Sequence, residues 1–475
     1  MHLSFKTRLS LVEPPSVFVD VSLMLLYISV LALLYIFRAV DLTVLIVCFD
    51  LMTVFLLIRS WKRFHGGMHP CWLFLLAVGF FQCGALLGYL FGDTSDPFVV
   101  TMMFISPFSV AEPYKAETLL CIALSMVFVY LPCAYQVSPK VYSAAFSLRF
   151  RQVIRWIFYV FLPFEFYKVW AYVRFTQSHG GYAANLLMNT ELRDAAGMPV
   201  RLASFVCASA FYLLLLTENR MPVLKYVYVF YISALLLSLG IGDRGGVLTQ
   251  FIMIWFVHKF KTGKSFKLVP MLIIGCLGAI LSAFIGHVRS NEAIEGSMNI
   301  VHFITGQGIS LQVTELAVAE HDTFAPHAIS YLLCGSGLCP GEIQSGQMLN
   351  RDVSEHLSSV RVEQGLGTGS SFVAEAFLLG GIAGVIIVSL CIGLALRLLH
   401  SVSDKKYGLA PTIMFLAAIV FMPRAEILSP VHSGLQIGVG MALVGAFAHF
   451  AARFFGFVAQ PISRLPQQLR SSAQL

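Results

Sequence analysis

The chain has 475 residues, of which 57% are hydrophobic and only 12% are charged, and its mean hydropathy is +0.78. Soluble domains carry about 25% charged residues, so this chain lacks the polar surface that a water-soluble fold needs, and it is too apolar to be intrinsically disordered. Its apolar runs are long and continuous, whereas a transmembrane β-barrel has short segments of alternating polarity. The composition therefore predicts an all-α polytopic membrane protein.

Apolar runs that are long enough to cross a bilayer recur along the whole chain. A helix needs about 20 residues to span a hydrocarbon core of about 30 Å. The first half contains Val17–Phe37, Ala39–Ile58, Cys71–Phe91, Ala116–Gln136, Val153–Phe175 and Val200–Thr217. The second half contains Leu224–Leu239, Gly245–Lys259, Leu268–Gly286, Phe372–Leu398, Leu409–Leu428 and Val431–Phe455. These runs predict about twelve transmembrane helices.

The basic residues predict the orientation of these spans. Lys and Arg gather in every second connection, as the positive-inside rule expects of cytoplasmic loops. Examples are Arg59–Arg63, Arg149–Arg155, Lys259–Lys267 and Lys405–Lys406. Both termini are then cytoplasmic. We interpret the formal net charge of +7 as a signal of topology, in preference to nucleic-acid binding.

One connection is far longer than the others. The chain divides into a bundle of nine spans over 1–286, a long loop over 287–371, and three further spans with a cytoplasmic tail over 372–475. The topology places the loop on the outer face of the membrane, and its apolar stretches, such as Ile309–Ala319, predict short helices against the membrane surface. Loops of this length are commonly functional, and the alternative is a structural cap on the bundle.

Cys334 and Cys339 belong to this loop. An oxidising periplasm permits a disulfide between them, and the sequence leaves the bonded and the free form open. Their spacing does not indicate a zinc site, because no second pair of Cys or His completes four ligands. The other cysteines lie in or beside apolar spans, where cysteine acts as a small hydrophobic residue.

The arginines of the loop are candidate binding residues. Arg289 begins the loop, Arg351 stands beside Asp352, and Arg361 follows. The planar guanidinium group matches phosphate oxygens in a bidentate manner. Several arginines above a membrane leaflet therefore indicate an anionic ligand that is presented from the lipid. The alternative for any single one is an arginine that faces solvent or lipid headgroups.

Charged residues also stand where spans meet the predicted outer surface. Arg244 lies in the glycine-rich turn Gly240–Gly246, whose backbone can approach a ligand closely and which opens a helix N-terminus that favours phosphate. Arg424 and Glu426 follow Pro423 at the outer end of the eleventh span. The alternatives are a compact hairpin at the first position and a local ion pair at the second.

Glu375 is the candidate general base. It lies one turn inside the tenth span, after the glycine- and serine-rich stretch Gly365–Ser371. A carboxylate in apolar surroundings resists ionisation, which makes it a usable base. Capping of the helix is the structural alternative for the stretch before it. Glu165 and Lys168, a helical turn apart in the fifth span, are predicted to pair with each other.

Several motifs resemble those of a known family. Arg351-Asp352-Val353-Ser354, the run Gly365-Leu-Gly-Thr-Gly-Ser-Ser-Phe-Val-Ala-Glu375 and Gly380-Gly-Ile-Ala-Gly384 resemble the Wzy-type oligosaccharide repeat-unit polymerases. The Gly242–Gly245 turn and the arrangement of about twelve spans with one large periplasmic loop between the ninth and the tenth are similar to that family as well.

The resemblance implies a fold like that of C-type glycosyltransferases and an enzyme of the bacterial inner membrane, active on its periplasmic face. It implies that undecaprenyl-diphosphate-linked repeat units are joined without a metal ion or cofactor, commonly with a chain-length-regulating co-polymerase. Arg244, Arg289 and Arg424 would then contact the diphosphate, and Glu375 would be the base. Two further arginines and one acid remain as candidates for sugar contact or for the base: Arg351, Arg361 and Asp352.

Two alternatives stay open. An O-antigen ligase shares the fold and the donor but transfers the glycan to lipid A core, and it would use a periplasmic histidine such as His321, His327 or His356. A flippase for the same lipid-linked sugars belongs to a different class. It would carry its charges at mid-membrane on broken helices, whereas here the charges gather at the outer rim.

Overall fold

The computed structural model describes residues 17–37, 41–90, 97–98, 112–135, 146–179, 188–241, 244–264, 267, 305–339, 344–359, 368–403 and 405–463. All regular secondary structure in these residues is helical, which confirms the predicted all-α class. Six described helices are long and apolar enough to cross a membrane, or seven if the bent pair α3 and α4 is counted as one span. The count of about twelve, the side of the termini and the position of the loop remain predictions.

The helices of the N-terminal half are α1 (Val17–Phe37), α2 (Leu42–Arg63), α3 (Pro70–Phe81), α4 (Gly84–Leu90), α5 (Glu112–Ala134), α6 (Leu148–Ser178), α8 (Asn189–Ala195), α9 (Met198–Thr217), α10 (Met221–Ser238), η1 (Leu239–Ile241) and α11 (Arg244–Thr262). Those of the C-terminal half are α14 (Ile309–Ala319), α15 (His321–Phe324), η2 (Ala325–His327), α16 (Ala328–Gly335), α17 (Leu349–Leu357), α19 (Phe372–Val402), α20 (Leu409–Phe421), η3 (Met422–Arg424) and α21 (Ser429–Ser463).

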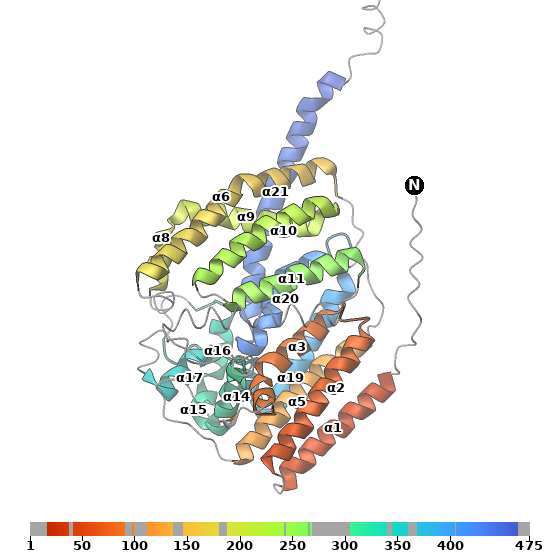
Figure 1. Cartoon of the computed structure of the whole chain (residues 1–475), viewed down its shortest axis with the longest axis vertical. Helices are drawn as coiled ribbons and strands as arrows, with labels where there is room; N and C mark the ends of the chain where they lie inside the picture. Colours follow the sequence, from red (N-terminus) through yellow and green to blue (C-terminus); the bar gives the residue numbers. More distant parts are fainter. Residues whose placement is uncertain are drawn as a thin grey trace, which may run out of the picture.

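The helices form two groups that α20 and α21 connect. Figure 1 shows α1, α2, α3, α5 and α19 at one end of the molecule and α6, α9 and α10 at the other. Within each group one pair packs most extensively, namely α5 with α19 and α6 with α9. The helix α20 contacts α3, α11 and α19, and α21 runs along α6 and α9. Residues far apart in the sequence therefore meet where α20 ends.

The packing of α5 against α19 depends on a glycine. A Cβ atom built on Gly393 would lie 2.5 Å from the carbonyl oxygen of Val129 and 3.0 Å from the side chain of Pro132. Only a residue without a side chain permits this approach of the two backbones, as is common between helices in membranes. The contact fixes α19 relative to α5 in the half that ends at Val402.

Two predicted spans are interrupted in the structure. The run Cys71–Phe91 forms two helices, α3 and α4, that are bent by 57° at the break. The helix α19 breaks at Gly380 and Gly381, and Gly381 has a φ of +59°, a conformation that glycine adopts at little cost. The hydropathy of both runs is continuous, so it did not predict either break.

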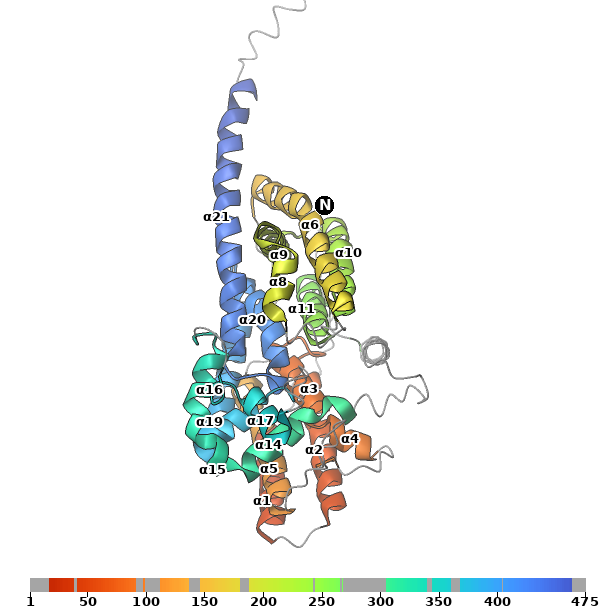
Figure 2. The ribbon, with the colours of Figure 1, turned by 90° about the vertical axis from the view of Figure 1, so that its left-hand side faces the viewer.

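The predicted loop contains the short helices α14 to α17, which form a second hydrophobic core. This core includes Val313, Tyr331 and Val353 from the loop and Ala374 and Leu378 from the first turns of α19. Figure 2 shows α14, α16 and α17 clustered beside α19. Cys334 and Cys339 form a disulfide, which settles the alternative that the sequence left open. The part of the loop that is described is thus a folded unit anchored on α19.

The predicted structural pair within the fifth span is confirmed. Lys168 Nζ donates to Glu165 Oε1 at 2.9 Å, and Ser204 of α9 donates to the same carboxylate. The pair therefore also links α6 to α9. The predicted ninth span, Leu268–Gly286, lies outside the described residues.

Candidate active site

The segment 423–427 begins within η3 and leads toward α21, and its backbone is held at three points. Gln82, at the break between α3 and α4, donates from Nε2 to the carbonyl oxygen of Pro423 at 2.8 Å. The backbone N–H of Ser370 donates to the carbonyl oxygen of Arg424 at 3.4 Å. The N–H of Ile427 donates to Glu375 Oε2 at 2.9 Å. The segment is therefore fixed both to α3 and to the start of α19.

Gln82 is the centre of a buried polar network. Its Nε2 also donates to Ser371 Oγ at 2.9 Å, and its Oε1 accepts from Thr314 Oγ1 of α14 at 3.3 Å. Thr314 and Ser371 share a hydrogen bond of 2.8 Å, and all three side chains are buried. Because buried amides and hydroxyls are costly without partners, this network fixes how α3, α14 and α19 meet.

Two carboxyl groups lie close together on this framework. Glu375, in the first turn of α19, is 1% exposed, and its carboxylate accepts from Ser370 Oγ at 3.2 Å as well as from Ile427. Glu426 lies near enough for its charge to act on Glu375. Glu426 is itself buried, and Gly335 packs against this side chain, since a Cβ there would lie 2.7 Å from Glu426 Cβ.

Arg424 stands two residues from Glu426 and is partly exposed. It donates from Nη1 to Gln307 Oε1 at 2.9 Å, and its guanidinium carbon lies 6.0 Å from the ring centre of Phe81, within the range of a cation–π contact. Gly369, with a φ of +80°, lies beside it, because a Cβ there would be 3.5 Å from Arg424 Cγ. The glycine-rich loop before α19 thus borders the arginine.

The start of α11 lies beside the same segment. A Cβ built on Gly245 would lie 2.8 Å from the ring of Phe421, the last residue of α20. Arg244 is the first residue of α11, and its side chain lies outside the described part of the structure. The glycine turn that the sequence singles out is therefore a neighbour of η3, which ends at Arg424.

Asp352 and Arg351 occupy a separate polar cluster on α17. The Asp352 carboxylate is buried; it accepts from Tyr331 Oη at 2.6 Å and from the N–H of Gly346 at 3.0 Å. Arg351 pairs with Glu355 one turn further along α17, with Nε 2.6 Å from Oε1. Burial and the Asp352 carboxylate raise the pKa of Tyr331, and the charge of Glu375 acts on this tyrosine too. Tyr331 thus lies between the two clusters.

The structure therefore brings together Glu375 and Arg424 of the predicted site residues, with the backbone of Arg244 nearby. Arg289 and Arg361 lie outside the described residues. Sequence reasoning did not single out Gln82 and Gln307, which support the site from other elements. Gln82 carried a usable signal, because it is a polar residue within the apolar run Cys71–Phe91.

The candidate histidines of the loop lie among its own helices. His327 lies against Gly346, where a Cβ would be 2.9 Å from its Nδ1. His356 packs edge-on against Phe324 with ring centres 5.5 Å apart, and His321 packs against Phe377 at 5.6 Å. His356 therefore borders the second hydrophobic core through Phe324, whereas His321 borders the main core through Phe377 of α19.

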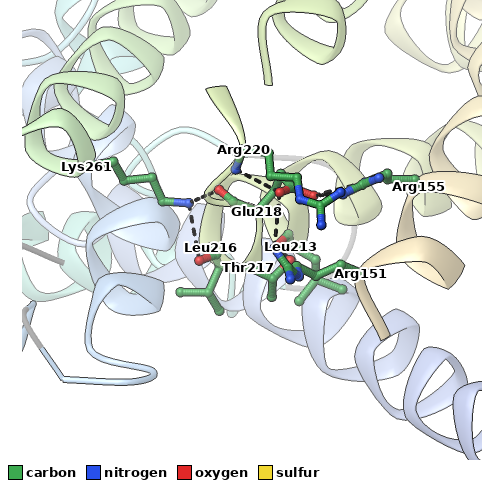
Figure 3. Close-up of polar contacts among 8 residues, drawn as sticks. All are labelled: Arg151, Arg155, Leu213, Leu216, Thr217, Glu218, Arg220 and Lys261. Atoms are coloured by element: carbon green, nitrogen blue, oxygen red, sulfur yellow. Dashed lines mark hydrogen bonds and ion pairs between the residues drawn. The ribbon is translucent and has the colours of Figure 1, made fainter. Parts of the chain in front are cut away.

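A second charged cluster surrounds Glu218 in the turn between α9 and α10 (Figure 3). The carboxylate is fully buried and accepts from Arg151 and Arg155 of α6. Lys261 of α11 donates to the carbonyl oxygens of Leu216 and Glu218 at 3.3 and 2.8 Å. Two arginines share one carboxylate and the lysine bonds to backbone carbonyls, so we interpret the cluster as a link between α6, the α9–α10 turn and α11.

Comparison with known proteins identifies a family whose model matches this chain. Searches of curated proteins and of solved structures gave no match. The family model of the O-antigen polysaccharide polymerase Wzy matches residues 17–445, a range that contains every residue of the candidate site. Members are multi-pass membrane polymerases of the glycosyltransferase type that act on lipid-linked oligosaccharide, which agrees with the apolar helices. The chain belongs to the O-antigen polysaccharide polymerase Wzy family.

Proposed function

We propose that this protein polymerises O-antigen by joining oligosaccharide repeat units that are linked to undecaprenyl diphosphate, at the periplasmic face of the bacterial inner membrane. The observation that carries this proposal is the segment 423–427, which presents a cation and a carboxyl group two residues apart on a backbone held at three points. A transfer from a lipid diphosphate needs both groups. The cation stabilises the negative charge of the departing diphosphate, and the carboxyl group accepts the proton of the acceptor hydroxyl.

In the proposed reaction, an acceptor sugar hydroxyl attacks the anomeric carbon at the reducing end of the growing chain. The bond from that carbon to the diphosphate oxygen breaks, and undecaprenyl diphosphate leaves with the electron pair. Arg424 is half-buried and fixed by Gln307, so its guanidinium can stabilise the developing charge without reorganisation. Arg244 and Arg289 complete the diphosphate contact in this proposal, which needs no metal ion.

We assign the proton of the acceptor hydroxyl to the carboxyl pair. Glu375 and Glu426 are close and buried, and two such carboxyl groups ionise as one unit, because the first charge opposes the second. The Ile427 N–H and Ser370 Oγ hold Glu375 in place. The pair therefore takes up one proton as the new glycosidic bond forms.

The remaining predicted residues receive supporting roles. The contacts of Asp352 with Tyr331 and Gly346 favour a part in holding the loop beside the site. Arg351, on the same helix, and Arg361 are proposed to contact sugar. The flippase alternative requires charges at mid-membrane, whereas Glu375 and Arg424 lie at the ends of apolar helices. A chain-length-regulating co-polymerase is the proposed protein partner.

The variant Arg424→Lys tests the proposed diphosphate contact. Lysine keeps the positive charge but loses the planar, bidentate fork, so we expect transfer to fall by roughly 10²–10³-fold, the loss typical of a missing oxyanion donor. Polymer formation is measured with lipid-linked repeat units and purified protein. Arg174→Lys is the matched control, because Arg174 is exposed and contacts Trp170 of its own helix. Full activity of Arg424→Lys at equal expression would remove Arg424 from the site.

A further inference from the structure

Three groups that prefer soft metal ions converge far from the candidate active site. One ring nitrogen of His69 and the sulfur atoms of Cys71 and Cys133 all lie within 4.8 Å of one another. The three side chains are buried, with at most 1% of each exposed. A histidine and two thiols at such separations match the donors of a structural zinc site.

The donors come from helices that pack against one another. His69 is the N-cap of α3, Cys71 lies in the first turn of α3, and Cys133 lies in the last turn of α5. His400, in the last turn of α19, borders this group without belonging to it: its ring centre is 4.2 Å from that of His69, and it is also buried. The helices α3, α5 and α19 contact each other pairwise.

Charge favours zinc at this position. Two thiolates neutralise a divalent cation, and two imidazoles add ligands without charge, so the complete group is neutral and costs little to bury. The guanidinium of Arg63 is also buried and donates to the carbonyl oxygen of Ala134, next to Cys133, at 2.6 Å. A cation that kept its full charge would be repelled there, whereas a neutral complex is not.

We propose that His69, Cys71 and Cys133 bind a structural zinc ion that joins α3 to α5, with the adjacent His400 of α19 turning toward the ion as its fourth ligand. Zinc binding releases the protons of the two thiols. It also replaces the weak hydrogen bonds that these side chains make in the absence of the ion. The thiol of Cys133 donates to the Gly393 carbonyl at 3.2 Å and that of Cys71 to the Val129 carbonyl at 3.9 Å. The Nδ1 of His69 accepts the Cys71 N–H at 3.1 Å, and a helix cap is worth far less than zinc–thiolate bonds.

A bound ion would stabilise the packing of α3 and α19, and the opposite ends of these two helices carry residues of the candidate active site. Gln82 follows the last residue of α3, and Glu375 lies in the first turn of α19, whereas the proposed ligands lie at the start of α3 and in the last turns of α5 and α19. The zinc site therefore goes beyond the proposed transfer reaction and takes no part in its chemistry.

The test is the metal content of the full-length chain, purified in detergent with a tag that has no histidines and without chelators. We expect about one zinc ion per chain, and we expect the double variant Cys71→Ser, Cys133→Ser to fall to the level of the buffer. Cys121→Ser is the matched control, because Cys121 is equally buried on α5 and has no place in the cluster. This control should keep its zinc.

Cobalt provides a second measurement on the unmodified chain, which matters if the double variant does not fold. Replacing zinc by Co²⁺ should produce the absorption of a tetrahedral site with thiolate-to-cobalt charge transfer. Unmodified protein without zinc that also fails to give this spectrum would overturn the proposal, and so would a double variant that keeps its zinc. Neither result bears on the transfer reaction, which is measured separately.

Discussion

Glu375 and Glu426 approach each other from different parts of the chain, one from the first turn of α19 and the other from the segment before α21. The N–H of Ile427 bonds to Glu375, so the position of one carboxyl group depends on the residue that follows the other. Their effects on catalysis are therefore expected to be coupled.

A double-mutant cycle measures this coupling. Glu375→Gln and Glu426→Gln should each reduce polymer formation by roughly 10²–10⁴-fold, the usual contribution of a general base. The double variant should be no slower than the slower single variant, because removing either member disables the pair. Asp322→Asn is the control, since Asp322 is fully exposed in the loop. Losses that add, or one single variant with full activity, would contradict the shared role.

Among the residues that meet at the candidate site, the sequence had singled out the charged ones. Glu375 and Arg424 stand at the ends of apolar runs, where a charge is costly and therefore informative. The partners Gln307 and Thr314 carry no such signal. Their roles depend on how the loop helices fold back against α3 and α19, which hydropathy does not encode.

Glu218 lies in the turn between α9 and α10, and the contacts around it connect this turn to α6 and α11 (Figure 3). Burial alone would raise its pKa, but the N–H of Arg220 and the guanidinium of Arg155 outweigh this and lower the pKa below its ordinary value. A carboxylate with a lowered pKa in the folded state stabilises the fold at neutral pH, and this stabilisation is lost as the pH falls through that pKa.

Glu218→Gln is therefore expected to destabilise the protein by about 3–5 kcal/mol at neutral pH, because two arginines lose their buried partner. The difference should shrink as the solution is acidified, since the native carboxylate also loses its charge. Thermal unfolding in detergent over a series of pH values measures both effects. Glu191→Gln, at an exposed position of α8, is the control. An unchanged melting temperature at neutral pH would show that the cluster is not a structural link.

Predicted spans and observed helices agree where an apolar run is uniform and differ where a local feature intervenes. The run that became α9 was predicted within two residues, and α21 begins two residues before its predicted start but continues to Ser463, beyond the predicted end at Phe455. The break at Gln82 was not predicted, because both sides of it are apolar and its geometry depends on contacts with distant residues, namely Ser371, Pro423 and Thr314. The chain order of helices is thus readable from hydropathy, and their bends are not.

The predicted arrangement of the whole molecule across the membrane follows from the Lys and Arg pattern. It places the loop helices outside and the turn between α19 and α20 inside. Two exposed positions allow a direct test, Asp322 in the loop and Lys405 in that turn. Asp322→Cys should react with an impermeant thiol reagent added to intact spheroplasts, whereas Lys405→Cys should react only after the membrane is opened. The reverse pattern would invert the topology and remove the site from the periplasm.

The overall class was predictable because composition and periodicity are properties of the whole chain. The all-α fold and the family both followed from apolar runs and short motifs, and the match over residues 17–445 confirms the family. The meeting of η3, α3, α11 and α19 was not predictable, because it depends on contacts between residues hundreds of positions apart, such as Gln82 with Pro423.

Deletion of the gene, read as the pattern of lipopolysaccharide on a gel, tests most directly whether this protein polymerises repeat units. A polymerase predicts lipid A core that carries a single repeat unit, because ligation continues while extension stops. The ladder should return with the unaltered protein and not with Arg424→Lys. Complete loss of O-antigen, with lipid-linked polymer accumulating in the inner membrane, would instead identify a ligase and contradict the proposed reaction.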